Sequence, residues 1–274
     1  MKSVDLPLCV LACNINVRCG DQASFDLLAA GYSAFVLPID PDFQPALSID
    51  VSVNDKGTGW SMSCENTAIT CIDRYDLIYE FEKFITERVQ LMRANLFFVH
   101  GAALSIADRC VVISGKSGCG KSSLAWFMTH NGFEYLSDEL SPVNPDFLLV
   151  EPYPHALCMK NEPLTEPVLP ESTLFTEGTI HVPAFELPAR AVEQACPLSF
   201  LVFIDKGRHG QDLAWGRIGG AESAARLYSN GLNHLSHHGD GLPVVASIGS
   251  RVPSYLMSGG TVEERAQVVK SLFN

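Results

Sequence analysis

Gly115-Lys116-Ser117-Gly118-Cys119-Gly120-Lys121-Ser122 is the stretch of sequence that decides the fold. Its spacing is the GxxxxGKS pattern of a phosphate-binding loop, or P-loop. The apolar run Cys110–Ile113 precedes it, and the helical pattern Leu124–Met128 follows, so the motif has the strand–loop–helix context that it requires. A chance turn rich in glycine and serine would not need that context. We therefore predict that this stretch holds the phosphates of a nucleoside triphosphate.

The residue types of the motif fit this chemistry. The glycines let the backbone form a concave nest whose N–H groups point at phosphate oxygens, and the following helix adds the positive end of its dipole. Lys121 is expected to bridge the β- and γ-phosphates, and the Ser122 hydroxyl is expected to be a ligand of Mg²⁺. The motif does not distinguish ATP from GTP. The predicted nucleotide-binding residues are Gly115, Lys116, Ser117, Gly118, Cys119, Gly120, Lys121, Ser122 and Ser123.

The composition limits the partners. The chain has 274 residues, with 47% apolar and 18% charged residues and a formal net charge of -12. Such an acidic surface repels nucleic acid and anionic lipid, so we expect neither as a partner. No run of residues approaches the roughly 18–20 apolar residues of a membrane helix. The nine cysteines are odd in number and follow no framework, which is typical of reduced thiols in a cytoplasmic protein.

The first part of the chain is rich in predicted β-structure. Apolar residues alternate with polar ones in Leu47–Val53 and again in Trp60–Cys64, with a turn-rich segment between them, which predicts a hairpin. An amphipathic pattern then predicts a helix over about Asp73–Ala94. We expect an α/β protein with a β-rich N-terminal region at residues 1–72 and a P-loop core at residues 73–274.

Phosphoryl transfer also needs acidic residues, and two candidates compete. Asp138-Glu139 follows the apolar run Phe133–Leu136. Asp205 ends the apolar run Phe200–Ile204, as a metal-supporting acid of a generic P-loop protein would. Judged by local pattern alone, Asp205 is slightly favoured.

Three segments together resemble the HPr serine kinase/phosphorylase family. They are Val99-His100-Gly101-Ala102, the P-loop, and Leu136-Ser137-Asp138-Glu139. The closer likeness is to HPr-kinase-related proteins that carry two further segments, matched here by Cys158-Met159-Lys160-Asn161 and Gly178-Thr179-Ile180-His181. The resemblance covers residues 96–228, and residues 1–95 are only loosely similar.

The resemblance implies a fold and a set of roles. The fold is a P-loop core like those of HPr kinase and PEP carboxykinase, a mixed β-sheet with flanking helices. Asp138 would be the general base that takes the proton of the acceptor hydroxyl, or would orient that hydroxyl. Glu139 would support Mg²⁺ or a neighbouring side chain, and Asp205 becomes a structural residue. His100 would lie near the γ-phosphate or tune Asp138, with a core histidine as the alternative. Lys160 would neutralise charge in the transition state, with a surface lysine as the alternative.

The sequence also departs from that family. The family's acidic pair is Asp-Asp, whereas this chain has Asp138-Glu139, and its downstream Glu-containing signature has no match here. These departures leave the second metal ligand open and put a reverse, phosphorylase activity in doubt.

The leading hypothesis is an ATP- and Mg²⁺-dependent kinase that phosphorylates a serine hydroxyl of a protein or peptide. Relatives of this type act as tailoring enzymes beside ribosomal peptide pathways, including lasso peptides, so a precursor peptide is a candidate acceptor. The alternatives are a kinase for a small-molecule hydroxyl and a nucleotide-binding regulator without transfer activity. HPr kinases form hexamers, and the resemblance leaves a homo-oligomer open.

Two further expectations concern side chains around the motif. Cys119 lies inside the loop and is expected to be accessible to solvent when no nucleotide is bound. His234, His237 and His238 form a local cluster, which we interpret as a solvated helix end rather than a zinc site, because no matching cysteine or acidic ligand set accompanies it.

Overall fold

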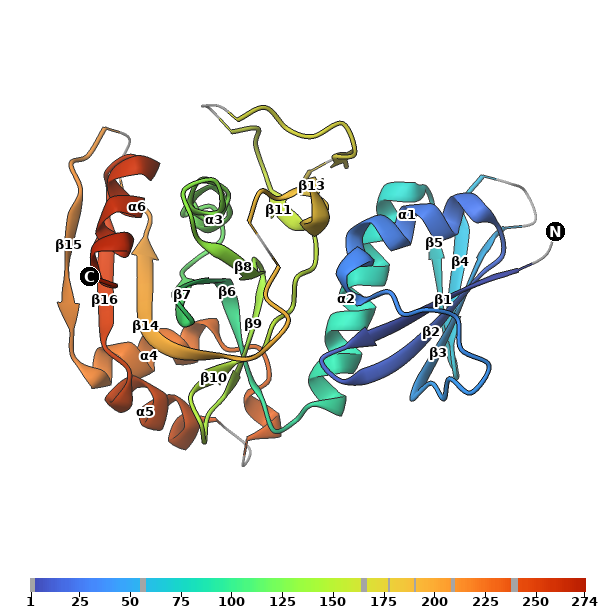
Figure 1. Cartoon of the computed structure of the whole chain (residues 1–274). Coiled ribbons are helices and arrows are strands. Elements are labelled where there is room, and N and C mark those ends of the chain that lie inside the picture. The colour runs from blue at the N-terminus through green and yellow to red at the C-terminus, as the bar shows by residue number, and fades with distance from the viewer. Residues whose placement is uncertain are drawn as a thin grey trace. The chain divides into compact units, whose positions relative to one another are not determined.

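The computed structural model describes residues 3–54, 58–163, 167–176, 178–189, 191–207, 210–237 and 241–274. The chain divides into two compact units (Figure 1). The chain up to Arg93 forms the first unit, with a short return at Phe175, and the rest forms the second. Helix α2 (Arg74–Met92) therefore belongs to the first unit, whereas the sequence-based boundary between residues 72 and 73 grouped it with the P-loop core. The expected α/β class is confirmed, since both units combine sheets with helices.

The first unit is a five-stranded sheet in the order β1-β2-β3-β4-β5, in which β2 and β3 are parallel and the other pairs antiparallel. Its elements are β1 (Val4–Val10), β2 (Cys13–Cys19), α1 (Gln22–Tyr32), η1 (Ser33–Phe35), β3 (Leu47–Val53), β4 (Trp60–Cys64), β5 (Thr67–Cys71) and α2. The predicted β3–β4 hairpin and the predicted helix are confirmed.

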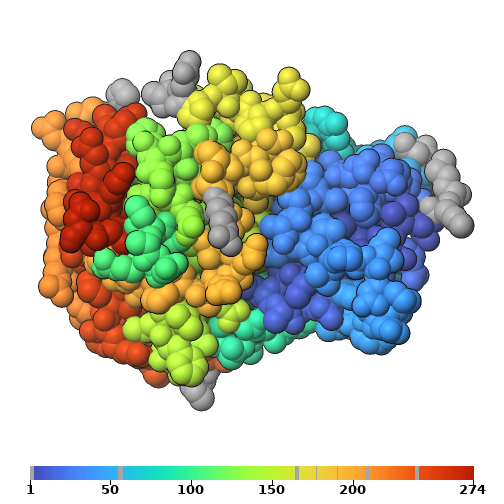
Figure 2. Space-filling model, in the orientation of Figure 1, coloured from blue at the N-terminus to red at the C-terminus, as the bar shows by residue number. Residues whose placement is uncertain are grey.

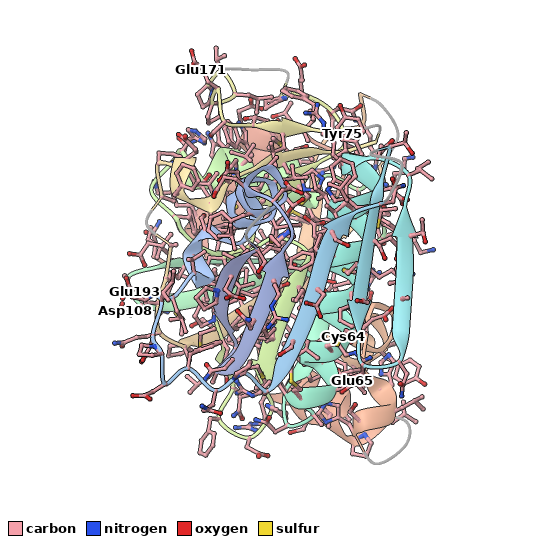
Figure 3. The ribbon with its side chains drawn as sticks, turned by 90° about the vertical axis from the view of Figure 1, so that its right-hand side faces the viewer. Cys64, Glu65, Tyr75, Asp108, Glu171 and Glu193 are labelled. Atoms are coloured by element: carbon pink, nitrogen blue, oxygen red, sulfur yellow. The ribbon has the colours of Figure 1, made fainter. Side chains whose placement is uncertain are left out.

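A helix cap and a tight turn define the path of the chain from β4 to α2. Asp73 caps α2, because its carboxylate accepts the backbone N–H groups of Tyr75 and Asp76. Glu65, labelled next to Cys64 in Figure 3, follows β4 with a φ of 51° and lies 3.8 Å from the guanidinium of Arg88. This turn returns the chain into β5 and places β4 and β5 beside the helix.

The second unit contains an eight-stranded sheet in the order β10-β9-β6-β7-β14-β16-β15, with β8 also paired to β6. β7, β14 and β16 are parallel, and the pairs flanking them are antiparallel. The sequence pattern predicts strands at 133–136, 148–151 and 200–204, and these correspond to β8, β10 and β14. The strands are β6 (Phe97–Ile106), β7 (Arg109–Ser114), β8 (Glu134–Ser137), β9 (Leu140–Asn144), β10 (Leu149–Val150), β14 (Cys196–Asp205), β15 (Ala214–Ile218) and β16 (Ser254–Ser258).

A small second sheet accompanies the large one, in the order β11-β13-β12. Its strands are short, and η2 (Ala184–Glu186) follows β13. The bounds are β11 (Leu157–Met159), β12 (Leu174–Phe175) and β13 (Ile180–Val182).

Helices cover both faces of the large sheet, and the strand residues alternate between them. Val111 and Ile113 of β7 pack under α3 (Lys121–Thr129) and α6 (Val262–Ser271). The intervening Val112 packs on the opposite face, with α4 (Gly220–Asn230) and α5 (Leu242–Arg251). Figure 1 shows the two pairs of helices on opposite sides of the sheet. The structure thus has the strand–loop–helix context that the P-loop motif predicts.

Strand β6 is continuous, whereas the sequence pattern predicts two strands, at 96–99 and 102–106, broken at His100-Gly101. Gly101 permits this continuity, because a Cβ atom at that position would lie 2.5 Å from the backbone oxygen of Ile113 in β7. At its end β6 turns into β7 through Ala107 and Asp108, both with positive φ, and Asp108 is labelled in Figure 3.

The C-terminal part confirms one expectation and corrects another. The Thr-x-x-Glu spacing of Thr261 and Glu264 predicts a capping box, and the two residues form it at the start of α6. The histidine cluster is not a solvated helix end: α4 stops at Asn230, and His237, beyond the short turn η3 (His234–Ser236), is buried with Nε2 2.9 Å from the Leu96 oxygen. His238 lies outside the described residues. No helix among the described residues is both long and apolar enough to span a bilayer.

Candidate functional site

Strand β6 brings the acidic pair beside the glycine-rich loop. Along one edge β6 pairs with β7, and along the other it pairs with β8 and then with β9. The change of partner falls at Gly101, whose N–H donates to the Glu139 oxygen at 3.2 Å and which faces Ser114 across the β6–β7 pair. Asp138-Glu139 and the start of the loop therefore flank the same two residues of β6, His100 and Gly101.

The loop between β7 and α3 requires its glycines. A Cβ atom on Gly115 would lie 2.3 Å from the Ile204 oxygen of β14. Gly118 and Gly120 have φ values of 79° and 98°, which side-chain-bearing residues rarely adopt. The buried Lys121 donates its ammonium to the Gly115 oxygen at 2.8 Å and so closes the loop. The side chains of Lys116, Ser117 and Ser123 remain exposed.

Cys119 differs from the expectation of an accessible thiol. Its exposed fraction is 5%, and it belongs to the apolar core under α3. Burial raises the pKa of its thiol, although the charge of Lys121 opposes the shift. The loop exposes its backbone to solvent and turns this side chain inward.

Asp138 is a buried carboxylate with one unfilled oxygen. Oδ2 accepts the backbone N–H of Cys158 at 2.9 Å, and Oδ1 has no hydrogen-bond partner. Burial, and next the charge of Glu139, raises the pKa of Asp138 to about 7; the Cys158 N–H, the Ser122 hydroxyl and Lys121 oppose the rise. The Ser122 hydroxyl is near enough to the carboxyl group to lower its pKa, but it does not make a hydrogen bond to Oδ1. A buried acceptor without a partner is costly, so the site retains a polar atom that a ligand can satisfy.

His100 shares these neighbours. Burial lowers its pKa, the charges of Lys121 and Lys160 act in the same direction, and Glu139 acts against them. The imidazole is therefore neutral at pH 7 and lies between two cations and one exposed carboxylate. This surrounding differs from that of a core histidine with only apolar neighbours.

Lys160 reaches the loop from the small sheet. It follows β11, and its ammonium donates to the Ser117 hydroxyl at 2.8 Å. Cys158, whose N–H donates to Asp138, lies in β11 itself, so β11 and the residue after it contact both the acid and the loop. The sequence alternatives for this lysine included a purely solvated side chain, and this contact favours a place at the site.

Asp205 points away from the loop. Strand alternation puts Ile204 on the α3 face and Asp205 on the α4 face. There its carboxylate oxygens accept two N–H groups of Arg226 at 3.0 and 3.2 Å, and Glu222 accepts a third at 3.0 Å. The local sequence pattern that favoured Asp205 carries no information on this ion pair. The pair engages the Asp205 carboxylate with Arg226 of α4, on the face of the sheet opposite α3.

Arg265 of α6 also contacts the loop, although no sequence motif marks it. Its Nη1 donates to the Cys119 oxygen at 2.9 Å and its Nε to the Gly259 oxygen at 2.7 Å. A lone arginine in the first turns of an amphipathic helix carries no sequence signal of such a contact. The P-loop motif is separated from it by more than half the chain.

The donor atoms suit Mg²⁺. The Ser122 hydroxyl and the Glu139 carboxylate, both proposed from the sequence, are near enough to Asp138 to influence its pKa, and both supply hard oxygen atoms. The unfilled Oδ1 of Asp138 adds a further oxygen at the same place.

No protein-family model matches the sequence, and no curated protein matches it. Among solved structures, the chain is similar to the Hpr(Ser) kinase/phosphatase from Coxiella burnetii, with a TM-score of 0.32 and 14% sequence identity. That match covers 64% of this chain and 93% of the other. The likeness is a distant one of fold, and conclusions about function rest on the chemistry of the site.

Proposed function

We propose that this chain is an ATP- and Mg²⁺-dependent kinase that transfers the γ-phosphoryl group to a serine hydroxyl of a protein or peptide. The observation that carries the proposal is the buried Asp138, whose Oδ1 has no partner, beside a loop with the GxxxxGKS sequence. A P-loop alone holds phosphates. Phosphoryl transfer to a hydroxyl requires, in addition, a base next to the loop.

Each residue has a part in the proposed reaction. The backbone of residues 115–122 and the Lys121 ammonium hold the β- and γ-phosphates. Oδ1 of Asp138 accepts the proton of the serine hydroxyl, while the serine oxygen attacks the γ-phosphorus and ADP leaves. A carboxylate whose pKa is about 7 suits this role, because it is ionised in part at neutral pH and still takes up a proton readily.

The cations around the loop support charge stabilisation. Lys160, held against Ser117, would neutralise charge on the transferring group, and His100, neutral at pH 7, adds no charge of its own. Ser122 and Glu139 would hold Mg²⁺, which when bound neutralises charge on the phosphates.

The test is incubation with ATP, Mg²⁺ and a Ser-containing peptide encoded beside the gene, followed by mass spectrometry of the peptide. We expect a gain of one phosphate on serine, and loss of that product with Asp138→Asn. Asn keeps the acceptor for the Cys158 N–H but cannot take the proton.

The other outcomes separate the alternatives. Unimpaired transfer by the Asp138→Asn variant would contradict the assignment of the base. ADP release that depends on a small-molecule alcohol and not on any peptide would indicate a metabolite kinase. Tight nucleotide binding without turnover on either acceptor class would indicate a regulator. Arg217→Ala, an exposed change on the edge strand β15, is the matched control.

A further inference from the structure

Arg265 is a half-buried cation at the loop with unused hydrogen-bonding capacity. Two of the five N–H donors of its guanidinium bind the Cys119 and Gly259 oxygens, which leaves three. Among the described residues, no carboxylate lies within ion-pair distance of it. Burial lowers its pKa; the Cys119 thiol opposes the shift, and no carboxylate does. Half-buried cations are normally paired, so this group is suited to a further partner.

The position of Arg265 relative to the glycines is close. Its Nη1 would lie 3.2 Å from a Cβ atom built on Gly120, the residue that precedes Lys121. Helix α6 packs beside α3, and in the space-filling view its red atoms border the green atoms of the α3 region (Figure 2). The guanidinium therefore lies at the wall of the loop rather than at a distant surface.

The topology determines which end of a nucleotide would meet Arg265. His100 lies in β6 and Asp138 follows β8, both on one side of β7 in the large sheet, and Lys160 follows β11 of the small sheet. Arg265 reaches the loop from the other side of β7, where β14 and β16 lie. Figure 1 shows α6 and the β11–β13 pair on opposite sides of α3. We expect a triphosphate whose γ-phosphate faces Asp138 to direct its nucleoside toward the flank of Arg265.

We propose that Arg265 contacts the nucleoside of the bound triphosphate, with its planar guanidinium stacked on the base or its spare N–H groups bonded to the sugar. This assignment rests on the proposed function, since it requires the nucleotide to bind with its γ-phosphate toward Asp138. Arginine suits the task because it offers a planar face and directed donors at once. The two carbonyl contacts fix the side chain before the ligand arrives, so little side-chain entropy is lost on binding.

The experiment compares two ligands that differ only in the nucleoside, ATP and inorganic tripolyphosphate, each with Mg²⁺, by titration calorimetry. The variants are Arg265→Met, which keeps most of the aliphatic stem, and Arg265→Lys, which keeps the charge. Arg217→Met, an exposed arginine of β15, is the control. Thermal melting of each variant verifies that it is folded.

We expect both Arg265 variants to weaken ATP binding about tenfold and tripolyphosphate binding less than twofold, the size of one stacking contact. An equal loss for both ligands would overturn the inference, because Arg265 would then act only by holding the loop. Undiminished ATP affinity would overturn it as well. If the wild-type protein binds neither ligand, the proposed function fails first, and this result is distinct from the other two.

Discussion

Asp138 combines two properties that rarely coexist without a functional reason. It is buried, yet one of its oxygens lacks a partner, and a carboxylate in that state destabilises the fold when it is ionised. Catalytic groups commonly carry such a cost, because the environment that shifts their pKa is the one that fits them to the reaction. The carboxyl of Asp205, by contrast, is satisfied by Arg226 and has no such cost.

The first prediction concerns stability against pH in the absence of Mg²⁺ and nucleotide. Burial raises the folded-state pKa of Asp138 to about 7, so the folded state binds the proton more tightly than the unfolded state does. Asp138 therefore costs stability progressively as pH rises from about 4 to about 7, and the cost is constant above that. Asp138→Asn should be more stable than wild type by about 2–4 kcal/mol at pH 8 and nearly equal at pH 4.

Urea unfolding of both proteins across this pH range measures the difference. A variant that is less stable than wild type at pH 8 would show that Asp138 is a structural, satisfied carboxylate.

The second prediction concerns Glu139. Its negative charge is, after burial, the largest cause of the raised pKa of Asp138. Glu139→Gln should lower that pKa. The pH above which ionisation of Asp138 causes no further loss of stability should therefore also be lower. The measurement is the stability difference caused by Asp138→Asn, taken once with Glu139 and once with Glu139→Gln. Identical pH curves in the two backgrounds would mean that the two carboxyl groups do not interact.

At the scale of elements, β6 organises the site. Its edge passes from β8 to β9 at the position where it also faces the start of the loop, so one strand sets the spacing between acid and phosphate cradle. The narrow point is Gly101, where β6 and β7 approach too closely for a side chain.

The third prediction tests that close approach. Gly101→Ala places a Cβ atom 2.5 Å from the Ile113 oxygen, so β6 must move away from β7. We expect a loss of about 1–3 kcal/mol in stability, as in other overpacked cores, together with reduced phosphate transfer. Gly216→Ala in β15 is the control, since nothing lies within 4 Å of that site. Denaturant unfolding should find the control within about 1 kcal/mol of wild type, and equal effects of the two changes would contradict the argument.

Elements with strong periodicity or terminal signals could be predicted from the sequence. The β3–β4 hairpin, helix α2 with its Asp73 cap, and the capping box of α6 are examples. Strand β6 was predicted in two pieces because a glycine inside a strand normally signals a break, and only the packing against β7 reveals why it is there. Strand β16 was missed, since its serine-flanked sequence is short and its pairing with β14 is a tertiary effect.

In the candidate site, too, the residues with a local sequence signal could be predicted and those placed by tertiary packing could not. The loop and the acidic pair were found by motif and resemblance, because both are contiguous in sequence. The contact of Lys160 with Ser117 depends on β11 lying beside the loop, and that of Arg265 depends on β16 placing α6 beside α3. Neither arrangement leaves a trace in local sequence.

At the scale of the whole molecule, the chain has two units with separate cores, and every residue of the candidate site lies in the second. A ligand that binds only the folded state of one unit stabilises that unit by mass action. The consequence can be observed without knowing the acceptor.

The fourth prediction is that calorimetric melting shows two transitions, of which only one moves when ATP and Mg²⁺ are added. At a ligand concentration of 100 times Kd, the second unit should gain about 2.7 kcal/mol. Lys121→Ala should abolish the shift and leave the unmoved transition in place. A ligand-induced rise of both transitions together would show that the units unfold as one.

The burial of the thiols has a practical consequence for spectroscopy. All nine cysteines are reduced, and Cys9 is the one among them that is not buried. A maleimide dye added to the native protein should therefore attach first to Cys9, in strand β1, and leave Cys119 inside the loop unmodified. The wild-type chain is in this respect already a nearly single-thiol protein, suited to fluorescence studies without prior removal of cysteines.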